Sequence, residues 1–399
     1  MKILPVLPAV IGLPVFAFLA LQVIVPGYYK LTAVPVHAGA GSVPVHAAAA
    51  TDARFVAAAE AASRSARALA SSSNLAGLSV AVGVDGRLVW AAGFGWADIA
   101  AQQPVTPDTQ FRIGAVSMPL TAAGVGLLVE RGQLDLDAPV QEYVPDFPRH
   151  DVPISTRQAM AHTAGFRHFR GERDYLPQQH CESVSQSLDL FAGDDLEFAP
   201  GTAWDFSSYG WMLVSAVVES AAGTRFDRYM AQEVFAPLGM RDTVPDDATR
   251  PIPQRTQFYW PRAWKDTSYG LEHPQEVDYS CFGGAAGYLS TPSDLVRFGL
   301  AMNAHALLDA RTTELLQAPV ALPSGKSTGY GLGWFVDRVE FAGADTLRVG
   351  HPGMAVGGMT SLQRFPEHGI VVAVSSNVTY PEVAPFAAEV ARLFSAARA

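Results

Sequence analysis

Segments that favour β-strands stand at both ends of this chain, and the sequence between them favours helices and loops. Near the N-terminus, the apolar runs 78–84 and 87–92 are separated by Asp85-Gly86, a pair that suits a type I′ turn. A second set of strand-like runs closes the chain, at residues 346–351, 359–365 and 370–376. Both chain ends are therefore predicted to complete one antiparallel sheet, in an α+β fold with flanking helices and a mostly helical lobe.

Two further segments are predicted to be helices that cover this sheet. Apolar positions recur at helical spacing over residues 51–70 and again over 382–397. The helical lobe is expected over about residues 119–265, and a pocket is expected between lobe and sheet.

Composition allows a large folded domain and argues against a nucleic-acid partner. Of 399 residues, 49% are hydrophobic and 17% are charged, so the chain can bury a sizeable core. The net charge is −10, and no cluster of Lys and Arg is available for phosphates. Cys181 and Cys281 are too few for a disulfide scaffold, and two inert thiols are the preferred interpretation, although their pairing stays open.

The N-terminus carries a long apolar segment. Residues 3–25 are uncharged and about long enough to span a bilayer, which needs roughly 20 residues, so 1–25 is predicted to be a signal anchor. A cleaved signal peptide remains the alternative, with a small-residue site near Ala38. Residues 26–50 are expected to be a linker and 51–399 the folded domain. We expect an exported protein, anchored in the inner membrane with a periplasmic domain.

Three short segments stand out as motifs. They are Phe111-Arg-Ile-Gly-Ala-Val-Ser-Met-Pro-Leu-Thr-Ala122, Pro200-Gly-Thr-Ala-Trp-Asp-Phe-Ser-Ser-Tyr-Gly-Trp211 and His351-Pro352-Gly353. Four more segments contribute to the resemblance described next, at residues 132–140, 161–166, 283–294 and 365–369.

Together these segments resemble the serine beta-lactamase and penicillin-binding protein-like superfamily, in particular its class C and D-Ala-D-Ala-carboxypeptidase-like branch. Residues 165–169, 187–191 and 198–201 are also similar to its mitochondrial beta-lactamase-like members. The resemblance implies a Ser-x-x-Lys pair on the first segment, in which the serine attacks and a neighbouring base takes its proton. Here Ala115 stands at the serine position and Met118 at the lysine position.

The other two segments are degenerate as well. Relative to the family pattern, Phe206 replaces a tyrosine that shares the general-base role, Ser208 replaces an asparagine, and Pro352 replaces a threonine. Ser to Ala and Tyr to Phe each delete one oxygen, and Lys to Met keeps an unbranched side chain, so shape is kept while chemistry is lost. Selection for a silent pocket and inactivation of an active parent would both give this pattern.

The resemblance also implies pocket residues that do not depend on the lost side chains. An oxyanion hole is expected from the backbone N–H groups of Ala115 and Met354, with Ser208, His351 and Gly353 in the pocket. Because Met118 removes the lysine cation and Pro352 supplies no hydroxyl, carboxylate ligands are expected to bind poorly there.

The sequence therefore predicts a catalytically silent protein of beta-lactamase-like fold that acts by binding or assembly. The alternative is an active serine hydrolase with a non-standard nucleophile. Ser117 is expected to point away from the site, which leaves Ser207 and Ser208, with His351 as a residual base near neutral pKa. Partners are expected to be a small-molecule or peptide ligand and the membrane, with self-assembly left open.

No metal or cofactor is predicted. Cys181 and four histidines, His162, His168, His180 and His351, match no metal-binding spacing. The glycine-rich run 283–287 is not followed by the Lys-Ser/Thr of a phosphate loop, and the resemblance implies that it is a turn in the pocket wall.

Overall fold

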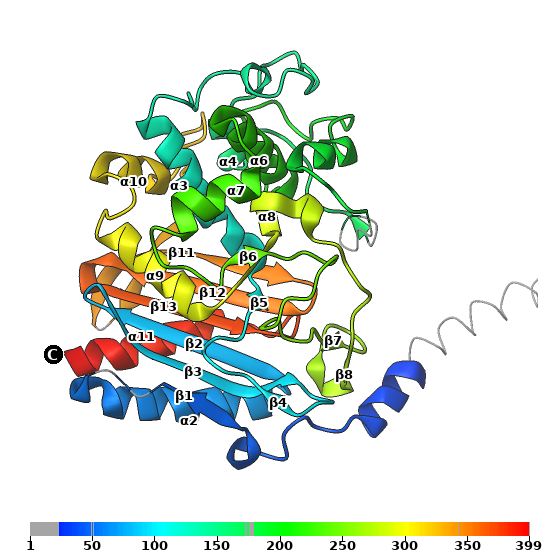
Figure 1. Cartoon of the computed structure of the whole chain (residues 1–399), viewed down its shortest axis with the longest axis vertical. Coiled ribbons are helices and arrows are strands. Elements are labelled where there is room, and N and C mark those ends of the chain that lie inside the picture. The colour runs from blue at the N-terminus through cyan, green and yellow to red at the C-terminus, as the bar shows by residue number, and fades with distance from the viewer. Residues whose placement is uncertain are drawn as a thin grey trace, which may run out of the picture.

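A computed structural model describes residues 24–48, 50, 52–171, 174, 179–341 and 343–398 of the chain (Figure 1). The segment predicted to be a signal anchor or signal peptide lies outside the described residues, apart from its last two positions. Within the described ranges, no helix is both long and apolar enough to cross a membrane.

One antiparallel sheet, completed by both ends of the chain, forms the centre of the fold, as predicted. Its strands follow the order β1-β3-β2-β13-β12-β11-β10, and β4 pairs with β3. The bounds are β1 Val45–Ala47, β2 Gly77–Val84, β3 Arg87–Asp98, β4 Gln103–Pro104, β10 Phe335–Phe341, β11 Ala344–Ala355, β12 Gly358–Phe365 and β13 Ile370–Ser376. Asp85 and Gly86 have φ of 48° and 81°, the left-handed values that a type I′ turn requires between β2 and β3.

Helices from the two chain ends cover one face of the sheet (Figure 1). These are α2 (Val56–Ser72) and α11 (Ala384–Arg398), which contact each other and the sheet. Phe394 of α11 stacks on both Phe55 and Trp90, with ring centroids 5.6 and 5.7 Å apart. Both predicted terminal helices are therefore confirmed, and they pack over an apolar core.

The other face carries α9 (Pro292–Asn303) and the helical lobe (Figure 1). The lobe packs around α3 (Ser117–Glu130) and α6 (Ser208–Ala222), which are largely buried along their length. Further helices on this side are α4 Thr156–Met160, α7 Phe226–Met230, α8 Gly283–Ala286 and α10 Ala310–Gln317. Short strands complete the lobe and its edges, at β5 Phe111–Arg112, β6 Val244–Pro245, β7 Trp260–Pro261, β8 Leu271–Glu272 and β9 Tyr288–Ser290.

The segment 26–50, expected to be a linker, is partly built into the domain. Residues 24–32 are helical, and β1 pairs with β3 at the edge of the sheet. His37 is buried, and its Nε2 lies 3.1 Å from the carbonyl oxygen of Leu75. A strand of three residues and one buried histidine produce no periodic pattern of apolar residues. The sequence of this segment therefore indicated a linker.

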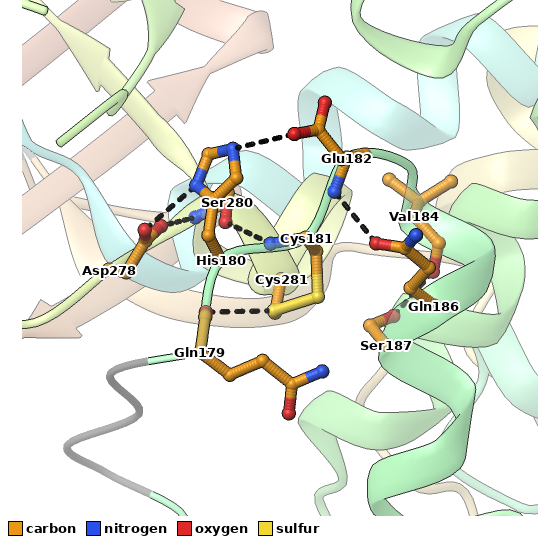
Figure 2. The surroundings of a disulfide bond; sticks show 10 residues. All are labelled: Gln179, His180, Cys181, Glu182, Val184, Gln186, Ser187, Asp278, Ser280 and Cys281. Carbon is orange, nitrogen blue, oxygen red and sulfur yellow. Dashed lines mark hydrogen bonds and ion pairs between the residues drawn. A yellow bond between two sulfur atoms is a disulfide. The ribbon is translucent and has the colours of Figure 1, made fainter. Parts of the chain in front are cut away.

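The interpretation of the two cysteines as separate thiols was wrong, because Cys181 and Cys281 form a disulfide (Figure 2). Cys281 lies in the 3₁₀ turn η8 (Ser280–Phe282), and Cys181 precedes the 3₁₀ helix η5 (Val184–Leu190). The backbone N–H of Cys181 also donates to Ser280 Oγ at 2.9 Å. Tertiary packing of the lobe brings the two segments together across a sequence separation of 100, which spacing alone does not reveal.

Candidate functional site

Two glycines bring the first and third motifs into backbone contact. A Cβ on Gly353 of β11 would overlap the carbonyl oxygen of Ile113, and a Cβ on Gly114 would overlap the backbone of Met354. Gly114 has φ of +53° and opens the 3₁₀ turn η3 (Gly114–Val116), which leads into α3. The close approach holds Ala115 beside Met354, the two residues whose backbone N–H groups are predicted to form an oxyanion hole.

A cavity of about 670 Å³ opens at this contact. Its lining residues include Ala115, His168, Phe169, Trp204, Phe206, Ser208, Trp260, Lys265, Tyr279, Phe282, Phe335, His351, Pro352, Gly353, Met354, Met359, Thr379 and Tyr380. We call Ala115, Phe206, Ser208, His351 and Gly353 the floor, and Trp260, Lys265, Phe335 and Tyr380 the rim. The structure thus brings together every predicted pocket residue of the three motifs.

Met118 is the exception among the predicted positions. Its side chain is fully buried beneath the floor and does not line the cavity. The Tyr330 hydroxyl lies 3.9 Å from the Met118 Sδ. Ser117 is likewise fully buried and absent from the lining, which agrees with the expectation that it points away from the site.

His351 is not the near-neutral base that the sequence suggested. Burial lowers the pKa of His351 to about 4, because the charged imidazolium would lose its hydration. Its Nδ1 lies 2.6 Å from the carbonyl oxygen of Pro352, which can only accept, so Nδ1 carries the proton. Nε2 then accepts from the Tyr330 hydroxyl at 2.9 Å. Both nitrogens of the neutral ring are occupied by partners inside the protein.

Two further histidines serve the second motif as hydrogen-bond acceptors. The backbone N–H of Ser207 donates to His162 Nδ1 at 3.1 Å, and that of Ser208 donates to His168 Nδ1 at 3.3 Å. Burial lowers the pKa of both imidazoles. A neutral ring whose Nδ1 accepts carries its proton on Nε2, so neither ring is arranged to take a proton from a neighbouring serine.

The other histidine of the group considered for metal binding lies elsewhere. His180 pairs with Asp278, with Nδ1 and Oδ2 2.9 Å apart beside the disulfide (Figure 2), and this contact raises its pKa. Across the described part of the chain, no group of three or more His, Cys, Asp or Glu side chains is arranged to hold a metal ion.

On the floor, an aromatic ring occupies the position where the family has the tyrosine hydroxyl. The Phe206 ring packs against His162 with centroids 4.4 Å apart and lies 6.3 Å from His351. The first residue of β10, Phe335, pairs with Gly350, so Pro352 of β11 lies beyond this pairing and has no β10 partner. A missing N–H is tolerated at such a position.

The rim comes from segments in which the sequence carries no motif. Lys265 lies between β7 and the turn η7 (Thr267–Tyr269), and Phe335 opens β10. The Lys265 ammonium lies 5.2 Å from the ring centroid of Tyr380. Only their positive φ angles mark Lys265 and Tyr380 as unusual, and those angles are visible in the structure rather than in the sequence.

Comparison with known proteins agrees with this architecture. The human serine beta-lactamase-like protein LACTB, mitochondrial, is 28% identical over 406 residues, which cover 76% of this chain and 73% of that protein. Penicillin-binding protein 4* of Bacillus subtilis (strain 168) is 27% identical over 303 residues, covering 73% of this chain and 66% of that protein.

Solved structures show the same fold. A penicillin binding protein from Bacillus halodurans superposes with a TM-score of 0.67 at 23% identity, covering 84% of this chain and 98% of that one. D-amino acid amidase from Ochrobactrum anthropi SV3 gives a TM-score of 0.65 at 22% identity, over 81% and 92% of the two chains. Residues 55–396 match the Beta-lactamase family, and the chain therefore belongs to that family.

Proposed function

We propose that this protein is a catalytically silent member of the Beta-lactamase family that uses its retained pocket to bind a ligand. The observation that carries the proposal is the methyl group of Ala115, which lines the cavity where the family's nucleophile is expected. Alanine has no nucleophilic atom, and acyl transfer by this fold begins with attack by a serine hydroxyl.

Two other hydroxyls of the cavity are already engaged by backbone groups. Tyr279 accepts a hydrogen bond from the Val356 N–H, and Thr379 donates to the Ala355 carbonyl oxygen while accepting from the Gly357 N–H. Ser208 remains as the rival nucleophile, but Nδ1 of the neighbouring His168 already accepts its backbone N–H. Without a base the serine hydroxyl stays protonated and weakly nucleophilic.

The proposal includes an exported, membrane-anchored location. Two features support it: the apolar N-terminal segment of the sequence and the Cys181–Cys281 disulfide, since disulfides persist mainly in oxidising compartments. Protein isolated from its native membrane can be alkylated at its thiols with and without prior reduction, and its mass measured. A mass shift that appears only after reduction would support this location. Free thiols in that preparation would argue against it.

Intact-mass spectrometry with a fluorophosphonate and with a penicillin tests the silence directly. The full chain is expected to remain unmodified by both reagents. The variant Ala115→Ser/Met118→Lys/Phe206→Tyr serves as the matched control, and it is expected to gain one adduct at position 115.

The rival hypothesis predicts a different result. An active hydrolase would give a stoichiometric adduct on the unaltered chain, mapping to a serine of the cavity and lost in the variant Ser208→Ala if that residue is the nucleophile. Such an adduct would overturn the proposed silence.

A further inference from the structure

Among the described residues, the cavity combines an aromatic lining with one Lys or Arg side chain. Its lining includes Phe169, Trp204, Phe282 and Met359 as well as Phe335 of the rim, and these side chains offer ring and thioether surface to a ligand. We call Phe169, Trp204, Phe282 and Met359 the wall. Among the described residues that line it, no Asp or Glu is present and Lys265 is the one Lys or Arg. A volume of about 670 Å³ falls in the range of pockets for small organic molecules, which is roughly 300–1,000 Å³.

Backbone geometry fixes Lys265 at the edge of this cavity. Trp264 and Lys265 have φ of 55° and 57°, and Tyr380, on the facing segment, has φ of 81°. Non-glycine residues rarely adopt these left-handed values, and such strain gathers at binding sites. The two segments place the ammonium 5.2 Å from the Tyr380 ring centroid, where the cation can interact with the ring face.

Within the described chain, Lys265 is not engaged by an acidic side chain. No ion pair joins it to a carboxylate, and Asp266, its neighbour, accepts from the Ser268 N–H at 2.8 Å instead. Glu272 accepts from the Trp260 indole N–H at 3.3 Å and does not line the cavity. The ammonium is exposed and available to a ligand.

The floor offers no competing charge. His351 and His168 are neutral at physiological pH, because burial lowers the pKa of each. Met118 lies beneath the floor, outside the cavity. A carboxylate on the floor would therefore lose its hydration without gaining a cation, which agrees with the expected poor binding there. At the rim the same carboxylate would meet Lys265 and remain near water.

We propose that the pocket binds a small organic acid whose aromatic or aliphatic body fills the cavity and whose single carboxylate pairs with Lys265 at the rim. The inference rests on the proposed function and deepens it by naming the class of ligand. A bulky apolar body supplies affinity through burial, and the ion pair fixes its orientation with the charge outward.

A matched pair of probes tests the proposal: 4-biphenylacetate and the uncharged 4-biphenylacetamide, titrated calorimetrically into the full chain. The acid is expected to bind about five-fold more tightly than the amide, because a partly exposed ion pair adds of order a few-fold. Lys265→Met is expected to remove that difference between the acid and the amide. Lys265→Arg should keep it, and Lys326→Met, which changes an exposed lysine away from the cavity, should have no effect.

A second variant separates the contribution of the ligand's apolar part from that of its carboxylate. Phe335→Ala is expected to weaken the acid and the amide by the same factor, with thermal melting used to confirm that each variant is folded. Equal binding of acid and amide, or a preference for the acid that survives in Lys265→Met, would overturn the inference, as would absence of binding by both probes at millimolar concentration. These outcomes leave the fluorophosphonate result unaffected, so failure of this inference and failure of the proposed silence are distinguishable.

Discussion

The floor and the rim of the cavity differ in both chemistry and origin. The floor comes from three motifs with family spacing, yet its catalytic positions hold Ala115 and Phe206, and its imidazole is neutral and occupied. The rim comes from segments without a motif, yet it holds the ammonium of Lys265. The comparison teaches that the parts of this site which are easiest to recognise are those that have lost their chemistry.

The two regions also differ in how firmly they are held. On the floor, Gly353 and Gly114 leave no room for even a methyl group between β11 and η3. At the rim, Lys265 is exposed and Trp260 and Tyr380 are partly exposed. A tightly packed floor should accept near-isosteric changes, whereas the rim should tolerate larger ones.

Restoring the floor should give the largest effect. We predict that Ala115→Ser/Met118→Lys/Phe206→Tyr raises the rate of nitrophenyl acetate hydrolysis at least about 100-fold above that in buffer alone. The unaltered chain should not exceed the rate in buffer. This rate enhancement is far below the factor of roughly a million that a complete nucleophile and base supply. A lysine at position 118 would lie near the Tyr330 hydroxyl, which now contacts the methionine sulfur.

Release of nitrophenolate, followed by its absorbance, measures this activity. Each single substitution is the control and should remain inactive, since nucleophile and base act as a unit. A folded triple variant without activity would mean that the floor has diverged beyond these three positions, as Ser208 and Pro352 suggest.

Much of the fold follows from local sequence signals. The Asp85-Gly86 turn, the closing strands and the C-terminal helix were predictable because period, turn chemistry and length act over a few residues. The predicted helix 382–397 and the observed α11 (Ala384–Arg398) differ by two residues at the start and one at the end. The pairing of β1 was missed because its three residues carry too little pattern.

The site was predictable only where a motif marks it. Ala115, Phe206 and His351 could be named from the resemblance to the family motifs, but the low pKa of His351 depends on burial, and its contact with Tyr330 depends on the fold. The disulfide and the position of Lys265 depend on how loops far apart in the sequence meet in three dimensions. No short-range signal encodes such contacts.

Removing the disulfide should have the largest effect on stability. Cys181→Ala/Cys281→Ala is predicted to lower the free energy of unfolding by about 3–5 kcal/mol, as expected for a bond that closes a loop of about 100 residues. Denaturant titration measures the change, and addition of a reductant to the unaltered chain is the matched comparison. Phe282, next to Cys281, lines the cavity, so binding at the rim should weaken as well. An unchanged denaturation midpoint would show that the wall is held without the bond.

Acidification should destabilise the protein through the floor. The folded-state pKa of His351 is about 4, below its ordinary value of 6.5, so between these pH values the unfolded chain binds a proton that the folded chain does not. Stability is therefore fully present above pH 6.5 and falls as the pH drops toward 4. The contribution of His351 between pH 7.5 and 5 is about 2 kcal/mol, from about 1.4 kcal/mol per pKa unit.

Denaturant titrations at these two pH values test the assignment. His351→Gln should reduce the loss, whereas His46→Gln, at an exposed position, should not change it. His162 and His168 are also buried with lowered pKa, so a smaller dependence will remain in the variant. An identical loss in the variant and the unaltered chain would exclude His351 as a contributor.

The smallest effect is expected for Phe206→Tyr alone, which separates the shape of the floor from its chemistry. Phe206 is partly buried and lines the cavity, so the added hydroxyl has space and access to water rather than a closed apolar contact. The free energy of unfolding should change by less than about 1 kcal/mol, as for other near-isosteric substitutions. No hydrolysis of nitrophenyl acetate should appear, because position 115 still lacks a nucleophile. Denaturation and ester assays on one preparation measure both quantities. A large loss of stability would mean that the Phe206 ring packs too tightly against His162 to admit the lost oxygen, and the floor would then be specialised for its present residues.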